Sequence, residues 1–190
     1  GAITGTTDAT INGLTVGKGA NSVFGNTVLG AAALDAAVTG GSNTAIGKSA
    51  LTTLTSGTSN TAVGLESLEA NTTGAHNTAV GVRALEANTT ANENTAIGRS
   101  AMFSNTTGAS NTAVGRSALK QNTTGANNVA VGSNTLDANT TGSNHIAIGN
   151  EALAANTTGS DNLAIGYSTL QKNTTGIRNV GVGSNALEDN

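Results

Sequence analysis

The chain contains no cysteine, no proline and no tryptophan, and it has only one tyrosine and two phenylalanines among its 190 residues. Without cysteine, disulfides do not hold the fold, and the redox state of the compartment does not constrain it. With aromatic residues at 2%, the chain cannot build the broad core of large side chains that a globular domain of this length usually buries. We therefore expect a thin, linear core of Ala, Val, Ile and Leu.

Charge and long apolar runs are also scarce. Charged residues make up 10% of the chain and the net charge is -3, which argues against nucleic acid or an anionic membrane surface as partner. No apolar run approaches the ~20 residues of a membrane-spanning helix. The chain starts Gly1-Ala2 rather than at a methionine, so we expect a processed product or an excised piece.

What the chain has instead is a repeat of seventeen residues. A glycine ends each Asn-Thr-Ala-Val-Gly block without one change in spacing, at Gly30, Gly47, Gly64, Gly81, Gly98, Gly115, Gly132, Gly149, Gly166 and Gly183. A fixed period of this size is typical of a solenoid, a fold that binds or builds rather than catalyses. We predict an all-β protein, a parallel β-solenoid (β-roll) of about ten 17-residue coils over residues 26–190, preceded by a lead-in strand or coil over residues 1–25.

Each block predicts a short strand. The residue before the glycine is always aliphatic, as Val114 and Val182 are, and two places earlier stands Thr or, from Val129 onward, an aliphatic residue. The residue between them is alanine in eight repeats. With a side-chain period of two, we expect the larger residues to point into the coil and the alanines to form an outward face.

A second core column stands four residues after each glycine, with Leu in nearly every repeat and Met102 in one. We predict a second short strand here; one turn of helix is the competing interpretation, since Ala-Leu-Glu and Ala-Leu-Lys favour helix.

Two asparagines recur in most repeats: one opens the strand, with His145 replacing it once, and the other opens an Asn-Thr-Thr-Gly turn from Asn71 onward, with Ala91 in place of the glycine once. Asn tolerates left-handed backbone and Gly supplies positive φ, so the second motif predicts a turn. Identical amides stacked at about 4.8 Å can form hydrogen-bonded ladders. Asn-Thr-Thr is also an N-glycosylation sequon, but regular copies favour a structural ladder.

These blocks carry a resemblance. Asn128-Val129-Ala130-Val131-Gly132 and the motifs ending at Gly149 and Gly166 resemble the head repeats of trimeric autotransporter adhesins. The longer 17-residue form, and the Ile11–Gly19 segment before it, look like arrays of phage tail-fibre and related bacterial surface proteins. Over residues 10–190 the resemblance implies a left-handed parallel β-roll, often three chains side by side, outside the cell.

Few residues suggest chemistry. His76 and His145 lie roughly four coils apart, about 19 Å, so they cannot share a metal ion. No acid pair recurs on one face, calcium-binding Gly-Gly-x-Gly-x-Asp repeats are absent, and Gly17-x-Gly19 lacks the third glycine of a dinucleotide site. We expect no catalytic residues, no cofactor and no metal.

Two sets of residues are candidates for contact with partners. The alanine face is the candidate assembly interface, because a smooth apolar stripe is better explained by a partner chain than by water; it comprises Ala45, Ala62, Ala79, Ala96, Ala113, Ala130, Ala147 and Ala164. Residues that vary while the frame stays fixed are candidates for a variable contact surface, although plain solvent exposure also explains them; they are Lys48, Arg99, Arg116, Lys120, Asn150 and Tyr167.

Three functions fit this pattern. The first is a non-enzymatic segment of an extracellular fibre, a tail fibre or surface adhesin, that assembles as a homotrimer and binds a cell-surface receptor or glycan. The second is a subunit of a self-polymerising extracellular filament, stacked through its coil ends. The third, a minor alternative, is an ice-binding solenoid, disfavoured because the column of Thr44 through Thr112 is continued by aliphatic residues and so is expected to face the core.

Overall fold

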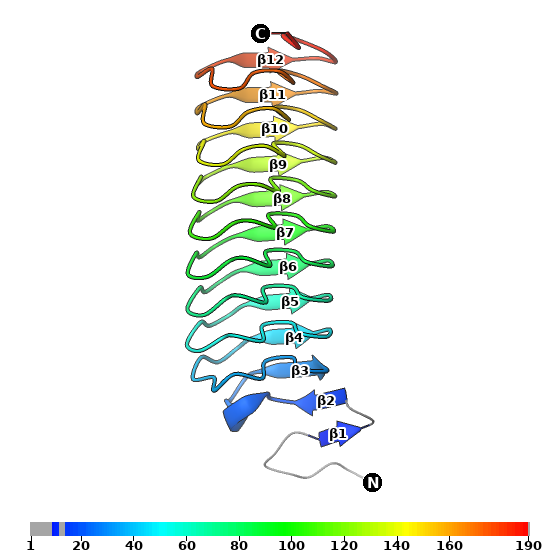
Figure 1. Ribbon diagram of the computed structural model, residues 1–190, viewed down its shortest axis with the longest axis vertical. Coiled ribbons are helices and arrows are strands. Elements are labelled where there is room, and N and C mark those ends of the chain that lie inside the picture. The colour runs from blue at the N-terminus through cyan, green and yellow to red at the C-terminus, as the bar shows by residue number, and fades with distance from the viewer. Residues whose placement is uncertain (1–8, 12–13, 190) are drawn as a thin grey trace.

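The computed structural model describes residues 9–11 and 14–189, and its strands form one twelve-stranded sheet in sequence order. Figure 1 shows the strands stacked one above the next along a straight rod. The strands are β1 (Ala9–Ile11), β2 (Leu14–Gly17), β3 (Thr27–Gly30), β4 (Thr44–Ile46), β5 (Thr61–Val63), β6 (Thr78–Val80), β7 (Thr95–Ile97), β8 (Thr112–Val114), β9 (Val129–Val131), β10 (Ile146–Ile148), β11 (Leu163–Ile165) and β12 (Val180–Val182).

From β3 to β12 every neighbouring pair of strands is parallel, and each residue pairs with its equivalent one repeat later, as Thr95 does with Thr112 and Ile97 with Val114. The result is a parallel β-solenoid of about nine turns of 17 residues, slightly fewer than the ten coils expected. Across the described residues no α-helix interrupts it. The all-β solenoid predicted from the period is confirmed.

The orientation predicted for the strands is wrong. The middle residue of each strand points into the coil: Ala45 through Ala164 have no exposed surface, and Val28 has almost none. The flanking residues point outward, so Val80 and Ile97 are exposed and Val114 is half-buried. The interior opposite the leucine has little room, which alanine fills from β4 to β11 and Val28 fills in the first coil.

The leucine column lies inside as predicted, with Leu34 through Leu170 and Met102 fully buried. Its backbone is neither a strand nor a helix, however. Residues 116–121 form a turn in which Leu119 has φ 53°, and the same left-handed conformation recurs at Leu51, Leu85 and Leu136. Hydrogen bonds to the next coil stabilise this unusual backbone, since the amide N–H of Leu119 donates to the carbonyl of Thr135 at 2.9 Å. A sequence pattern of helix-forming residues could not indicate such a turn.

The glycine that ends each strand is required by the stacking. At Gly115 φ is 139°, and a Cβ would lie 2.4 Å from the carbonyl oxygen of Gly132 in the next coil. Only a residue without a side chain allows the two backbones to approach this closely. The invariant glycine therefore sets the corner of each coil.

At the N-terminal side the ladder changes direction. β1 and β2 form an antiparallel pair, and β2 pairs antiparallel with β3, with Val16 opposite Leu29. The lower part of Figure 1 shows this hairpin beneath the first coil. Asn12 and Gly13, which belong to the Ile11–Gly19 segment of the sequence resemblance, lie outside the described residues.

Substitution of an inward alanine tests the orientation. Ala113→Asp places a carboxylate in a site without solvent exposure, which should destabilise the protein by about 3–5 kcal/mol. Ser59→Asp is the matched control, because Ser59 is exposed and the equivalent position of a later coil is already Asp161. Thermal unfolding should show a large loss for the first variant and almost none for the second; equal melting temperatures would place Ala113 outside the core.

Candidate functional site

The most extended surface feature is the outward side of the strands, which we call the outer strand face. It consists of the first and third residue of strands β3 to β12, in two straight columns held in register by the parallel pairing. The third-residue column is aliphatic throughout, and its members include Val80, Ile97, Ile148 and Ile165, all exposed. The sheet therefore presents a continuous apolar stripe to its surroundings.

The first-residue column changes along the rod. From β3 to β8 it is threonine, and from β9 onward it is Val129, Ile146, Leu163 and Val180. In the second half both columns are aliphatic, and exposure reaches 46% at Ile146 and 64% at Val180. The C-terminal half of the outer strand face is thus the more hydrophobic half.

The alanines predicted as the assembly interface cannot contact a partner. Ala45, Ala62, Ala79, Ala96, Ala113, Ala130, Ala147 and Ala164 are fully buried inside their own coil. Their neighbours on both sides in sequence form the exposed stripe instead. The predicted alanine stripe is therefore not at the surface, and the exposed apolar stripe is made by the aliphatic residues that were expected inside.

The candidates for a variable contact surface lie at the corner after each strand. Lys48, Arg99, Arg116, Asn150 and Tyr167 are exposed, and they occupy the same position in different coils. Lys120 lies further along the turn and is half-buried. Successive corners stack directly, since the amide of Ser117 donates to the carbonyl of Arg99 at 3.0 Å. A partner lying along this edge would therefore contact a row of different side chains.

Inside the coil, two columns of asparagine side chains are buried and hydrogen-bonded to one another and to the backbone. In the first Asn column, which opens the strands, Oδ1 of Asn94 accepts from the backbone N–H of Asn111 at 2.9 Å, and Nδ2 of Asn94 donates to the carbonyl of Gly108 at 2.9 Å. In the second Asn column, which opens the turns, Nδ2 of Asn105 donates to Oδ1 of Asn88 at 3.0 Å and to the same Gly108 carbonyl at 2.9 Å. The expected amide ladders are present, and the sequon asparagines are inaccessible in the folded chain.

A hydroxyl ladder accompanies them on the turn. Oγ1 of Thr106 donates to the carbonyl of Thr123 at 3.0 Å, and Thr123 donates to Thr140 in the same way. The threonines of the outer strand face differ, because the hydroxyls of Thr44 through Thr112 donate to no group in the described part of the chain. One threonine column links the coils, and the other leaves its hydroxyls available.

The two histidines have different environments. His76 is exposed in a turn with φ 59°, whereas His145 is buried and replaces asparagine in the first Asn column. Burial lowers the pKa of His145, and its contact with the carbonyl of Gly159 acts in the opposite direction. The ring therefore favours its neutral form.

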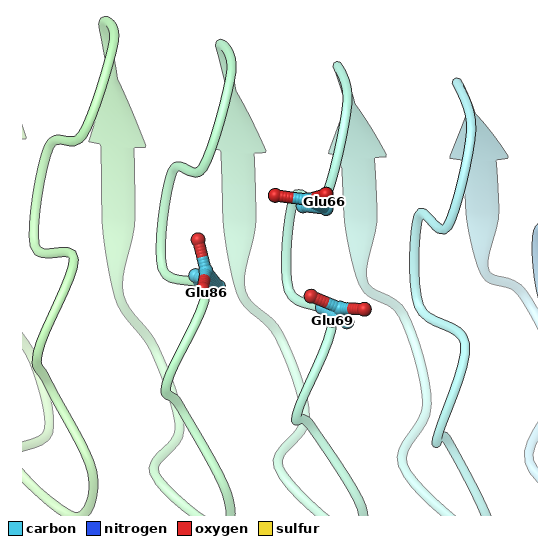
Figure 2. Close-up of side chains that lie close together, drawn as sticks. All are labelled: Glu66, Glu69 and Glu86. Carbon is cyan, nitrogen blue, oxygen red and sulfur yellow. The ribbon is translucent and has the colours of Figure 1, made fainter.

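A cluster of charged groups connects two neighbouring coils on the side away from the strands (Figure 2). Carboxylate oxygens of Glu66, Glu69 and Glu86 lie within 4.8 Å of one another. Arg83 Nε lies 2.7 Å from Glu66 Oε2 and 3.1 Å from Glu86 Oε2, and its guanidinium stacks over the ring of Phe103. Burial raises the pKa of Glu86, although Arg83 opposes this shift.

This cluster corrects the expectation that no acid pair recurs on one face. Glu69 and Glu86 occupy the same phase of consecutive repeats, so the 17-residue spacing could have identified them. The geometry is one that a divalent cation could use. Arg83 already supplies a positive charge between the carboxylates, so the cluster has less need of a metal ion to offset their repulsion.

Comparison with family models, with curated proteins and with solved structures found no match for this chain. Within the described residues, no helix has the length and apolar character needed to cross a membrane. The candidate sites therefore rest on the geometry of the chain itself.

Removal of one buried amide tests the ladder. Asn105→Ala leaves Oδ1 of Asn88 buried without its donor and removes the acceptor of Asn122 Nδ2, so we expect a loss of about 2–4 kcal/mol in unfolding free energy. Gln121→Ala, at an exposed position nearby, should change stability by less than about 0.5 kcal/mol. Denaturant titration of both variants measures the difference; a silent Asn105→Ala would show that the amides add no stability.

A chelator tests the acidic cluster. Because Arg83 already lies between Glu66 and Glu86 and offsets part of their charge, we expect EDTA to leave the melting temperature unchanged and added Ca²⁺ not to raise it. In Arg83→Ala the carboxylates lose their cation, and Ca²⁺ should then raise the melting temperature. A fall in the melting temperature of the unaltered protein in EDTA would mean that a metal ion belongs to the fold.

Proposed function

We propose that the chain is a non-enzymatic structural segment of an extracellular fibre, a tail fibre or a surface adhesin, in which three copies pack side by side through their outer strand faces. The observation that carries the proposal is the aliphatic column running the whole length of the rod with exposed Val and Ile side chains. With a rod of roughly 43 Å and a stripe of about 10 Å, the area is about 400 Å² per copy, which falls within the ~300–600 Å² of the largest apolar patch on a typical soluble monomer, a patch that is often functional.

The ends of the sheet also favour side-by-side packing of copies over end-to-end stacking of their coils. β2 covers the edge of β3 in an antiparallel sense, so the parallel ladder of the coils does not continue beyond β3 on that side. A filament formed by stacking coil on coil needs a parallel edge at both ends. Cryo-electron microscopy separates the two arrangements: discrete rods support the fibre segment, and rows of unlimited length support the filament.

The resemblance to adhesin and tail-fibre repeats supports two further parts of the proposal, namely three copies per fibre and a location outside the cell. Three chains side by side would enclose the aliphatic stripes between them and leave the variable corners outside. The adhesive role then falls to Lys48, Arg99, Arg116, Asn150 and Tyr167, at the exposed corners, with Lys120 beside them.

A single charge on the outer strand face tests the assembly. Light scattering of the unaltered protein should give three times the chain mass of 18.4 kDa. Ile148→Asp should give a monomer, since assembly would strand a carboxylate among aliphatic side chains. Asn150→Asp, two residues away and exposed at the corner, is the control and should keep the assembled mass. A monomeric unaltered protein would contradict the proposal.

The adhesive role has its own test. A variant in which Arg99, Arg116 and Tyr167 are replaced by serine keeps the fold, because Ser133 and Ser184 occupy the same position in other coils. It should lose binding to cell-surface glycans that the unaltered protein binds, while its mass stays the same. Equal binding by both proteins would place receptor contact elsewhere.

Ice binding remains a second candidate, because the reason for disfavouring it is removed. The threonines of β4 to β8 lie on the outer strand face in a straight row and have free hydroxyls beside aliphatic side chains. Such a face cannot be covered by other copies and bind ice at once. Inhibition of ice recrystallisation by a monomeric protein, abolished by Thr95→Tyr but not by Thr107→Tyr in the exposed turn, would favour this function over the fibre.

A further inference from the structure

The replacement of one asparagine by histidine interrupts both Asn columns at the coil of β10. In the other coils, Oδ1 of the first-column asparagine accepts from the next backbone N–H at 2.8–3.0 Å. At this coil the acceptor is Nδ1 of His145, and the bond from the N–H of Asn162 is longer, at 3.3 Å. One hydrogen bond between the coils of β10 and β11 therefore depends on a group that can be protonated.

The remaining ring nitrogen fixes the protonation state. Nε2 of His145 lies 2.7 Å from the carbonyl oxygen of Gly159, which can only accept, so Nε2 carries the proton and Nδ1 is the acceptor for Asn162. Nδ2 of Asn156 lies 3.2 Å from the same Nε2. The two donors share the Gly159 carbonyl, as the paired Nδ2 groups of the other coils share theirs.

The second Asn column is interrupted at the same place. Oδ1 of Asn156 is buried and has no hydrogen-bond partner, whereas Oδ1 of Asn139 accepts from Asn156 at 2.9 Å. Nδ2 of Asn173 donates to the carbonyl of Gly176 rather than to Asn156. The coils on either side of β10 are therefore joined by fewer side-chain hydrogen bonds than the coils before them.

A second proton on the ring removes the one bond by which the first column joins these two coils, and the strand pairing and the backbone hydrogen bonds between them are left. Protonated Nδ1 cannot accept from Asn162, and a cation would then lie in a site with no exposed surface. Of the charged side chains described, Asp161 in the turn before β11 acts on the ring. The other groups packed against it are amides and carbonyls of Asn128, Asn156, Asn162 and Gly159.

We propose that His145 is an acid-sensitive release point of the solenoid, at which protonation separates the coil of β10 from that of β11 and frees the coils of β11 and β12. Coils of a solenoid contact only their neighbours, so opening here leaves β3 to β10 folded. If the fibre proposed above is correct, the freed coils include the most exposed part of its aliphatic stripe, at Val180 and Val182. The release itself does not depend on assembly.

The direction of the pH dependence follows from linkage. Because the pKa of His145 is lowered in the folded coil, the opened state binds more protons than the folded state once the pH falls below about 6.5, the ordinary value for histidine. The folded contact is therefore fully stable above that pH and weakens as the pH falls. From pH 7.5 to pH 5.0 the opening equilibrium should rise by up to about 30-fold.

Hydrogen exchange followed by mass spectrometry tests this proposal. After correction for the intrinsic pH dependence of exchange, amides of residues 162–182 should lose protection between pH 7.5 and 5.0, while amides of residues 95–131 should keep theirs. His145→Asn restores the Asn column and should abolish the loss. His145→Gln, which cannot be protonated but does not restore the column, should also remove the pH dependence, even if the coils are less protected at both pH values.

His76→Asn is the control for the other histidine, which is exposed, and it should behave like the unaltered protein. The proposal is overturned if His145→Asn and His145→Gln keep the acid-induced loss, or if the unaltered protein is equally protected at both pH values. Loss of protection along the whole rod would also overturn it, since that result would indicate general acid unfolding. The oligomeric mass at pH 7.5 and 5.0, measured in parallel, shows separately whether the fibre proposal holds.

Discussion

The hydrogen bonding of the two buried Asn columns is the constraint on which the rest of this structure depends. A buried amide without a partner is costly, and here its partners are supplied by the equivalent residues one repeat away, as Asn105 is bonded to Asn88 and Asn122. One inserted residue would move every later amide away from its partner. The invariant 17-residue period is thus the consequence of satisfying polar groups inside a coil with few apolar ones.

The same narrow interior determines what lies outside. With two asparagines and one leucine inside most coils, little room is left at the middle of the strand, where alanine stands from β4 to β11. The β-branched residues that favour a strand must then occupy the outward positions. The same choice of residues therefore fills the coil and creates the apolar surface that we propose is covered by other copies.

The sequence predicted the period, the strands, the buried leucine column and the Asn ladders, because each rests on identical residues recurring at one phase. It did not predict which side of the strand faces inward. A three-residue strand can point its middle residue inward and its two end residues outward, or the reverse. Val and Ile are usually buried in preference to Ala, and this preference led to the prediction that Val114 faces inward and Ala113 outward, which is wrong. The left-handed turn at Leu119 could not be predicted either, since leucine seldom adopts that backbone and hydrogen bonds to the next coil hold it there. The cluster of Glu69, Glu86 and Arg83 was accessible from the spacing alone.

The central claim is that alanines fill the coil while the aliphatic stripe is covered by other copies of the chain. Methyl NMR with a soluble paramagnetic agent measures both parts in one sample. The account predicts that the methyl signals of Ala96, Ile97 and Ile148 are all shielded from the agent, whereas the methyl of Ile177, exposed in a turn, is broadened. Broadening of Ile97 and Ile148 to the same degree as Ile177 would contradict the account, because it would show that the outer strand face is open to solvent.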